Sequence, residues 1–152
     1  MHTVRRARVD DRNELAEMCA LLWPDAPVEE HAGEIDGKLA TGMSGTLPVA
    51  IYVAEGQGAA LTGFIEVGLR SHADGCDPLH PVGFIEGWFV REQYRGRGFG
   101  RELILAAEEW ARKQRCREMA SDALIDNADS LNAHAACGFE VVDRCVHFRK
   151  SL

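Results

Sequence analysis

Six stretches of the chain carry the hydrophobic pattern of β-strands, either as alternating apolar and polar residues or as a short apolar run. They are residues 3–9, 49–54, 60–70, 84–90, 118–124 and 140–150, and the last is expected to form a strand or a hairpin. In the stretch 60–70, every second residue from Leu61 to Leu69 is apolar or glycine, which predicts one face against a core. The stretch 84–90 is apolar except for Glu86 and Gly87.

Four other stretches repeat apolar residues at helical spacing. The first begins after Asp10 or Asp11, either of which is expected to cap it, with Glu14 three residues after Asp11 as in a capping box. The second spans 29–43, the third begins at Phe99, and the fourth spans 130–137 and is closed by Gly138. The residues expected on the buried faces of the first three are Leu15, Met18, Cys19 and Leu22; Ala32, Ile35, Leu39 and Met43; and Phe99, Leu103, Ala106, Ala107 and Trp110.

The order of these elements predicts a single domain over residues 1–152. A helix connects strand 84–90 to strand 118–124, so these two strands are expected to be parallel, whereas the preceding strands follow one another as antiparallel neighbours. This is an α/β (α+β) fold with a mixed, mostly antiparallel sheet and one parallel βαβ pair. Ligands in such sheets bind beyond the C-terminal ends of diverging parallel strands, which places Val90, the segment after it and Asp122 near one another.

Composition excludes several classes of protein. The net charge of −7 argues against a nucleic-acid partner, which favours basic patches, and is compatible with a cationic small molecule. The five cysteines are odd in number and contain no C-x-x-C, which argues against a disulfide framework or a zinc site and predicts reduced thiols in the cytoplasm. We expect no metal, no signal peptide and no membrane span.

The most informative motif is a glycine-rich loop, Arg95-Gly96-Arg97-Gly98-Phe99-Gly100, which follows a strand and opens a helix. Free backbone N–H groups and the positive end of the helix dipole form a cradle for phosphate there, and Arg95 and Arg97 can add charge-assisted hydrogen bonds. The spacing is not that of a dinucleotide fingerprint, and no G-K-[ST] closes the loop as in a P-loop.

The spacing R-x-x-G-x-G after a strand resembles the pyrophosphate-binding loop of the GCN5-related N-acetyltransferases (GNAT). Over nearly the whole chain the sequence also looks like the aminoglycoside 6′-N-acetyltransferases. This second resemblance is carried by 22–24, 75–77, 84–90, 95–100, 116–122, Asn127, Ser130, His134, 138–140 and 148–150. It implies a GNAT fold with the parallel pair splayed around acetyl-CoA, helices on both faces of the sheet, and acetyl transfer to the 6′-amine of an aminoglycoside.

The chemistry needs a proton acceptor, because an alkylammonium must lose a proton before its nitrogen attacks a thioester. Glu86 and Asp122 are the two candidates, and each would also attract a cationic substrate. Asp122 is favoured because it ends its strand at the mouth of the expected cleft. The alternatives are that Glu86 pairs with a structural arginine and that Asp122 caps a helix or loop. His134 stands where many relatives carry a tyrosine that protonates the leaving thiolate; it is either that acid or a packed residue.

Cofactor contacts are expected from the strand, the loop and one asparagine. An N–H of the strand segment 88–90 would stabilise the thioester oxyanion, aided by a bulge near Gly87, and the pantetheine arm would pair like an extra strand. The residues expected to contact acetyl-CoA are Trp88, Phe89, Val90, Arg95, Gly96, Arg97, Gly98, Phe99, Gly100, Arg101 and Asn127.

The acceptor site is expected to include Trp23 and Asp77 in addition to Glu86 and Asp122, although Trp23 could equally be a core residue. The resemblance further implies a homodimer, for which the apolar stretch 141–148 offers a strand interface. Two alternatives remain. The chain could acetylate another primary amine, such as a polyamine or a protein amine, or it could be a non-catalytic module that binds acyl-CoA or a drug.

Overall fold

A computed structural model describes residues 3–152 of the chain. Its centre is a mixed sheet with the strand order β1-β3-β4-β5-β6, to which β2 adds by pairing with β3. The neighbours are antiparallel except for β5 and β6, which are parallel as predicted. The strands are β1 (Thr3–Arg6), β2 (Met43–Ser44), β3 (Leu47–Glu55), β4 (Leu61–Arg70), β5 (Val82–Val90) and β6 (Met119–Ser121).

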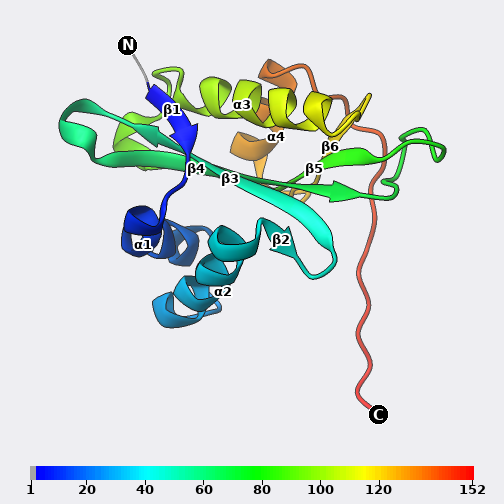
Figure 1. Ribbon diagram of the computed structural model, residues 1–152. Coiled ribbons are helices and arrows are strands. Elements are labelled where there is room, and N and C mark those ends of the chain that lie inside the picture. Colours follow the sequence, from blue (N-terminus) through cyan, green and yellow to red (C-terminus); the bar gives the residue numbers. More distant parts are fainter. Residues whose placement is uncertain (1–2) are drawn as a thin grey trace.

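Helices cover both faces of this sheet, which confirms the predicted layers (Figure 1). The helices α1 (Arg12–Leu22) and α2 (Val28–Thr41) lie on one face, called here the α1–α2 face. The helices α3 (Phe99–Lys113) and α4 (Ala128–Ala136) lie on the other, the α3–α4 face. None of the helices within residues 3–152 has the length and the apolar run that crossing a bilayer requires.

Each face has its own hydrophobic core, and the predicted periodicities build both. On the α1–α2 face, Leu15, Met18 and Cys19 of α1 and Ile35 of α2 pack on the sheet. On the α3–α4 face, the predicted stripe of α3 is buried against β3, β4 and β5, except for Ala106, which is only half-buried, and Leu103 and Ala107 are fully enclosed. The sheet therefore lies between two cores, which is why its central strands are apolar on both faces.

The predicted bulge is present in β5. Glu66 on β4 is opposite Gly87, whereas the next residue, Val67, is opposite Ile85, so Glu86 has no partner on β4. One extra residue on one strand of an antiparallel pair is a β-bulge. The bulge lies at Glu86 and Gly87, the two residues that interrupt the apolar run of β5.

The predicted capping box at α1 is wrong. Asp11 stands at the N-cap position, but its side chain caps no helix amide. It accepts hydrogen bonds from Arg5 Nη1 and Nη2 at 2.7 and 2.9 Å and from the N–H of Arg8 at 2.7 Å. Glu14 instead accepts from the N–H of Leu61 at 3.1 Å. Both carboxylates are therefore bound by groups outside helix α1.

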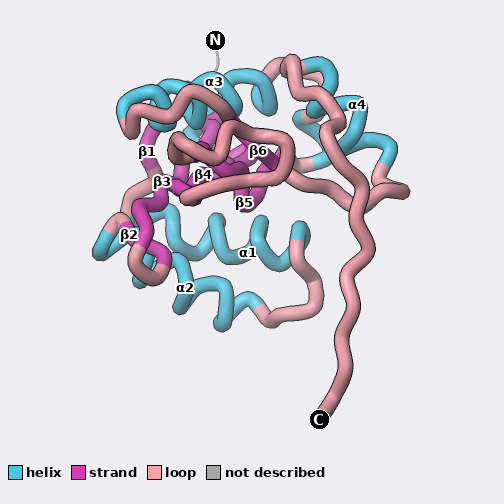
Figure 2. The backbone as a smooth tube through the Cα atoms, turned by 90° about the vertical axis from the view of Figure 1, so that its right-hand side faces the viewer, coloured by secondary structure: helices cyan, strands magenta, loops and turns pink. Residues whose placement is uncertain are grey.

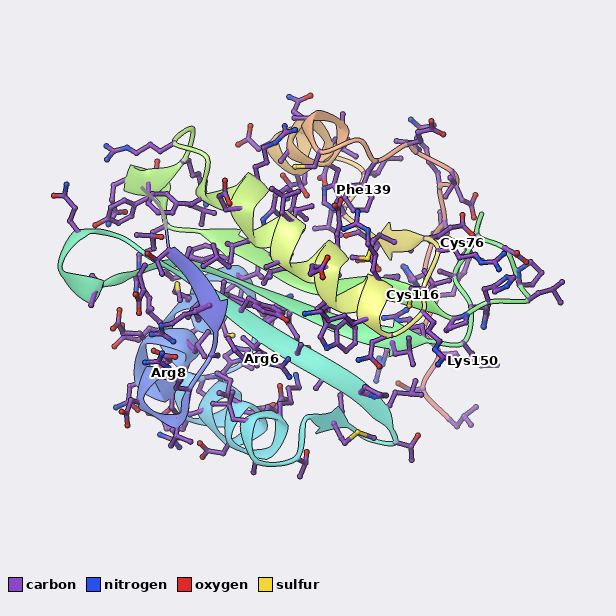
Figure 3. All side chains as sticks on the ribbon, turned by 45° about the horizontal axis from the view of Figure 1, so that its top comes forward. Arg6, Arg8, Cys76, Cys116, Phe139 and Lys150 are labelled. Atoms are coloured by element: carbon purple, nitrogen blue, oxygen red, sulfur yellow. The ribbon has the colours of Figure 1, made fainter. Side chains whose placement is uncertain are left out.

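The strand or hairpin predicted for 140–150 is also absent. Residues 140–152, called here the C-terminal tail, contain no helix or strand and leave the body of the molecule in an extended path (Figure 2). In Figure 3, Phe139 lies beside α4, whereas Lys150 lies on the departing segment. Val146 and Phe148 are 75 and 92% exposed. The tail has the hydrophobic pattern of a strand, but its backbone N–H and C=O groups form no hydrogen bonds with the backbone of the rest of the described chain.

Candidate active site

The parallel strands separate at one definite rung. Their pairs are Gly83 with Met119, Phe84 with Ala120 and Ile85 with Ser121, and no pair follows. The next residue of β5 is the bulged Glu86, and the next residue after β6 is Asp122. The two predicted carboxylates therefore both stand one residue beyond the last rung.

The bulge also turns backbone amides of β5 toward the gap. The N–H of Gly83 donates to the carbonyl of Glu118, on the β6 side, and the N–H of Arg91 donates to the carbonyl of Thr62, on the β4 side. Successive amides of a strand alternate between its two sides, and the bulge inserts one residue into that alternation. Counting back from Arg91, the N–H groups of Trp88 and Val90 point away from β4, into the space beyond the end of β6.

The glycine-rich loop follows directly and opens α3 as predicted. Gly96 and Gly98 have φ values of +73° and +93°, which side chains rarely adopt, and Gly98 is the N-cap residue of α3. Arg95 donates from Nε to the carbonyl of Val90 at 2.9 Å, which fastens the loop to the end of β5. The guanidinium of Arg97 lies 5.8 Å from the ring centre of Tyr94. The loop is a backbone cradle with two arginines at its start.

Gly100 sits against Trp88 of β5. The indole Nε1–H donates to the carbonyl of Gly100 at 3.2 Å, and a Cβ at Gly100 would lie 3.3 Å from the indole ring. This contact joins the first turn of α3 to the strand whose amides face the gap. Phe99 is buried beneath the turn, in edge contact with Tyr94, so its side chain supports the loop from the core.

On the α1–α2 face, Glu86 is paired with Arg70. The guanidinium donates from Nε to Oε1 at 3.1 Å and from Nη2 to Oε2 at 3.0 Å, and it stacks on the ring of Phe84 with its carbon 3.4 Å from the ring centre. The pair of Arg70 and Glu86 is the arrangement that the sequence left open as an alternative, in which Glu86 binds a structural arginine. The carboxylate remains partly exposed, with 32% of its side-chain surface accessible.

Trp23 lies directly over the bulge. A Cβ at Gly87 would come within 2.4 Å of the indole Cη2, so only glycine leaves room for the ring at this position. The indole makes an edge contact with Phe64 and stacks with His31, while 38% of the residue remains exposed. Trp23 is therefore both a packed residue and part of the surface beside Glu86.

A pocket of about 280 Å³ opens beside Glu86 on the same face. It holds a second carboxylate, Glu66, which is only 8% exposed and accepts both its hydrogen bonds from Lys38 Nζ, at 2.9 and 3.1 Å. Glu66, Lys38 and Arg70 were not predicted as site residues from the sequence. The sequence did contain a signal for Glu66, because it is the only charged residue between Leu61 and Leu69 in the predicted strand.

Asp122 differs from Glu86 in its surroundings. It is exposed, it directly follows β6, and its carboxylate has no hydrogen bond or ion pair with any residue of the described chain. It does not cap a helix, since the N-cap of α4 is Asn127, whose side chain accepts from the N–H of Ser130 at 3.1 Å. The cap alternative for Asp122 is therefore wrong for helix α4.

His134 of α4 reaches back to the divergence. Its Nε2 lies 2.8 Å from Ser121 Oγ, and its Nδ1 lies 2.7 Å from the carbonyl oxygen of Ser130. The ring is in edge contact with Trp88 and Phe139, at 5.2 and 5.3 Å between ring centres. His134 is thus both packed and placed between the two diverging strands.

The remaining predicted residues are held in local contacts. Asp77 accepts from the N–H of Leu79 and from His80 Nδ1, and these hydrogen bonds, the backbone one foremost, hold the pKa of its carboxyl below the ordinary value. Its own N–H donates to Glu118 at 2.7 Å, near the start of β6. Arg101 reaches toward the carbonyl of Ala136. Whether these two residues, or Asn127, also contact substrates stays a prediction.

The described cysteines are all free, and residues 3–152 contain no group of three or more His, Cys, Asp or Glu side chains that could hold a metal ion. Burial raises the pKa of the Cys19 thiol to about 12, which makes it an inert core residue. The groups that the described chain places at the divergence are carboxylates, an imidazole, a hydroxyl and backbone amides.

Comparison with known families agrees with this geometry. Residues 13–139 match the model of the acetyltransferase (GNAT) family. The aminoglycoside N(6′)-acetyltransferase type 1 of Stenotrophomonas maltophilia is 37% identical, over 99% of this chain and 94% of its own length. The protein of the same name from Klebsiella aerogenes is 38% identical, over 98 and 96% of the two chains.

Solved structures give the same result in three dimensions. AAC(6′)-Iy in complex with the bisubstrate analogue CoA-S-monomethyl-acetylneamine superposes with a TM-score of 0.88 at 31% identity, over 100% of this chain and 99% of the other. The aminoglycoside 6′-N-acetyltransferase AAC(6′)-Ih from Acinetobacter baumannii gives a TM-score of 0.87 at 27% identity, with the same coverage.

Proposed function

The chain belongs to the acetyltransferase (GNAT) family, and from this we propose that it transfers an acetyl group from acetyl-CoA to the 6′-amino group of aminoglycosides, a reaction that confers resistance to these antibiotics. The observation that carries the proposal is the full-length likeness to AAC(6′)-Iy, whose structure contains an analogue joining CoA to acetylneamine. The divergence of β5 and β6 provides the two sides that such a reaction needs, one for a thioester and one for an amine.

Acetyl-CoA fits the α3–α4 side of the divergence. The cradle of Gly96, Gly98 and Gly100 would hold the pyrophosphate at the N-terminus of α3. The free amides of Trp88 and Val90 would pair with the pantetheine arm as a neighbouring strand does. One of them would donate to the thioester oxygen when it gains negative charge. The bulge decides which amides face the gap, because it shifts the alternation by one residue and turns there those of Trp88 and Val90 in place of Gly87 and Phe89.

The amine would approach from the α1–α2 face, between Trp23 and the carboxylates. Asp122, exposed and without a protein partner in the described chain, would accept a proton from the ammonium, directly or through water. The free amine would then attack the thioester carbon in a ternary complex. Glu86 and Glu66, with their paired cations, would set the field of the pocket that holds the remaining ammonium groups.

A homodimer is part of this proposal, and the C-terminal tail supports it. On an extended chain Val142, Val146 and Phe148 share one side, and all three are more than 60% exposed. Near the start of the tail, Val142 lies beside Gly75, where a Cβ would come within 2.6 Å of its side chain. A strand of this pattern without a partner is completed most simply by the sheet of a second copy. The free thiols and the acidic charge favour a reduced cytoplasm as the place of action.

Two other functions would use the same site. A polyamine or a protein amine would also be attracted to the carboxylates, and a module that binds acyl-CoA without turnover would share the cradle. An assay of thiol release from acetyl-CoA separates the three, using aminoglycosides, polyamines and a lysine-rich peptide as acceptors. Preferred turnover of aminoglycosides supports the proposal, preferred turnover of another amine supports the first alternative, and binding without release supports the second.

A further inference from the structure

The hydrogen bonds of His134 define which of its nitrogens carries a proton. The carbonyl oxygen of Ser130, 2.7 Å from Nδ1, can only accept, so Nδ1 must be protonated. In the neutral ring Nε2 is then an acceptor, and its partner at 2.8 Å is the hydroxyl of Ser121. Both nitrogens are therefore engaged with other groups of the chain.

The edges of the ring are also covered. Trp88 from β5 and Phe139 after α4 meet the ring in perpendicular contacts, with interplanar angles of 89 and 76°. The groups that contact His134 from β5, β6, its own helix and the segment after it are Trp88, Ser121, Ser130 and Phe139, and none of them carries a charge. A sulfur atom in the gap would therefore meet the hydroxyl of Ser121 and not a free nitrogen of the ring.

Ser121 occupies the last rung of the parallel pair, opposite Ile85, where the gap between the strands begins. Its hydroxyl and the indole of Trp88 both touch the ring of His134, one from each strand. The hydroxyl thus stands across the gap from the strand segment whose amides face it. The residue as a whole is half-buried.

We propose that the hydroxyl of Ser121, and not the ring of His134, gives the departing CoA sulfur its proton, and that His134 is the positioning residue that orients and recharges this hydroxyl. This proposal rests on the proposed acetyl transfer and names a catalytic residue for it. It answers the question whether His134 is an acid or a packed residue, because the ring acts through Ser121 from a packed position.

In the acetyl transfer, the amine nitrogen forms its bond to the acetyl carbon, and the carbon–sulfur bond breaks with its electron pair on sulfur. Protonated His134 donates a hydrogen bond from Nε2 to Ser121 Oγ, which leaves the hydroxyl hydrogen free to point at the sulfur. The hydroxyl then gives this hydrogen to the sulfur as a proton, and Oγ takes the Nε2 proton from the ring in its place. The ring is left neutral and regains a proton from solvent. The ammonium gives one proton to Asp122 before the attack, its nitrogen loses a second proton after the attack, and both protons pass on to solvent. Only the charged ring releases the hydroxyl hydrogen, because the neutral ring holds it.

The test compares Ser121→Ala, Ser121→Thr, His134→Gln and the double variant Ser121→Ala/His134→Gln, with neamine as the acceptor. Ser121→Ala and His134→Gln are each expected to lower kcat by about 10²-fold, the lower end for a lost general acid, with unchanged acetyl-CoA affinity by calorimetry. The double variant should be no slower than either single variant, since both remove one relay. Ser121→Thr keeps the hydroxyl and should stay within about threefold of wild type. The fall of kcat at high pH should vanish in His134→Gln.

Two further measurements test the relay, namely the hydrolysis of acetyl-CoA without amine and the nitrogen-15 NMR spectrum of His134. Hydrolysis of acetyl-CoA by water expels the same thiolate, so the variants are also compared without amine. If wild type does not acetylate neamine, the proposed function fails, while the hydrolysis comparison still decides the relay. Nitrogen-15 NMR should show neutral His134 protonated at Nδ1. Wild-type kcat in Ser121→Ala, additive losses in the double variant, or a proton on Nε2 of the neutral ring would each overturn the proposal.

Discussion

Arg70 donates two hydrogen bonds to the carboxylate of Glu86, one to each oxygen, at 3.1 and 3.0 Å. Asp122, on the other diverging strand, has no such donor within the described chain. A planar guanidinium that binds a carboxylate through both oxygens fixes its orientation and charge. The two carboxylates at the divergence are therefore suited to different work, with Glu86 holding position and field and Asp122 available to accept a proton.

The substitutions Asp122→Asn and Glu86→Gln separate these roles. Asp122→Asn is expected to lower kcat by about 10²–10⁴-fold, the range for a lost general base. Glu86→Gln should mainly raise KM for the amine, the sign of lost binding that is equal in ground and transition states. Steady-state kinetics across pH give the measurement, and the acidic limb of the profile should disappear only in Asp122→Asn. Unchanged kcat and an unchanged acidic limb in both variants and in the double variant would show that the amine deprotonates into solvent.

Gly87 is expected to be intolerant of a methyl group because the indole of Trp23 occupies the space of its Cβ. Gly87→Ala should displace the indole, lower the free energy of unfolding by about 1–3 kcal/mol as overpacking does, and raise KM for the amine more than KM for acetyl-CoA. Thermal unfolding and kinetics provide the measurement. Gly37→Ala in α2 is the control, since nothing lies within 4 Å of its Cβ position, and it should leave activity unchanged. Wild-type amine KM in Gly87→Ala would remove Trp23 from the acceptor site.

The phosphate cradle is tested by Gly98→Ala. Gly98 has a φ of +93°, so alanine there adds backbone strain and a methyl group close to the amides of the loop. We expect acetyl-CoA affinity to fall at least about tenfold, a loss of about 1.4 kcal/mol, by calorimetry. Gly42→Ala at the end of α2 also places alanine at a positive φ, +67°, and is remote from the loop. It should lose stability and keep its affinity. Equal affinities in the two variants would contradict the assignment of the loop.

Asp11 predicts an acid-dependent part of the stability. Its hydrogen bonds with Arg5, and with the N–H of Arg8, hold the pKa of its carboxyl below the ordinary value, so the charged form is the stabilising one. This stability is present above the unfolded pKa of about 3.9 and is lost as pH falls through the lower folded pKa. Asp11→Asn should lower the free energy of unfolding by about 2 kcal/mol at pH 7, the scale of hydrogen bonds to charged groups.

Urea unfolding of wild type and Asp11→Asn between pH 7 and pH 2 measures this difference. It should stay constant from pH 7 to about pH 5 and shrink below about pH 3.9 as Asp11 becomes protonated. Arg12→Gln is a suitable comparison, because Arg12 pairs with Asp36 at the surface and should contribute less than about 1 kcal/mol. A difference that is independent of pH would assign the effect of Asp11→Asn to packing.

The sequence predicted the parts of this molecule that local pattern determines. The alternation in 60–70 and the stripe from Phe99 to Trp110 correspond to β4 and α3, because burial on a fixed face repeats with the period of the element. The helix that connects β5 to β6 required them to be parallel, so the sequence also brought Glu86, Asp122 and the loop together.

What the sequence did not predict depends on contacts that spacing along the chain does not reveal. The spacing of Asp11 and Glu14 fits a capping box, yet Arg5 and the N–H of Leu61 bind these carboxylates. The pairs of Arg70 with Glu86 and Lys38 with Glu66 join residues 16 and 28 positions apart, which no local pattern reveals. The C-terminal tail has the hydrophobic pattern of a strand, but a strand forms only when its backbone pairs with a neighbouring strand, and none of the described strands pairs with the tail.

The central claim is tested most directly by two aminoglycosides that differ only in carrying an amine or a hydroxyl at the 6′ carbon. Each is incubated with the protein and acetyl-CoA, thiol release is followed, and the product is located by mass spectrometry and NMR. We predict rapid release with the 6′-amine compound, one added acetyl group on its 6′ nitrogen, and only the background rate with the 6′-hydroxyl compound. Equal turnover of the two compounds, or acetylation at another amine, would contradict the account.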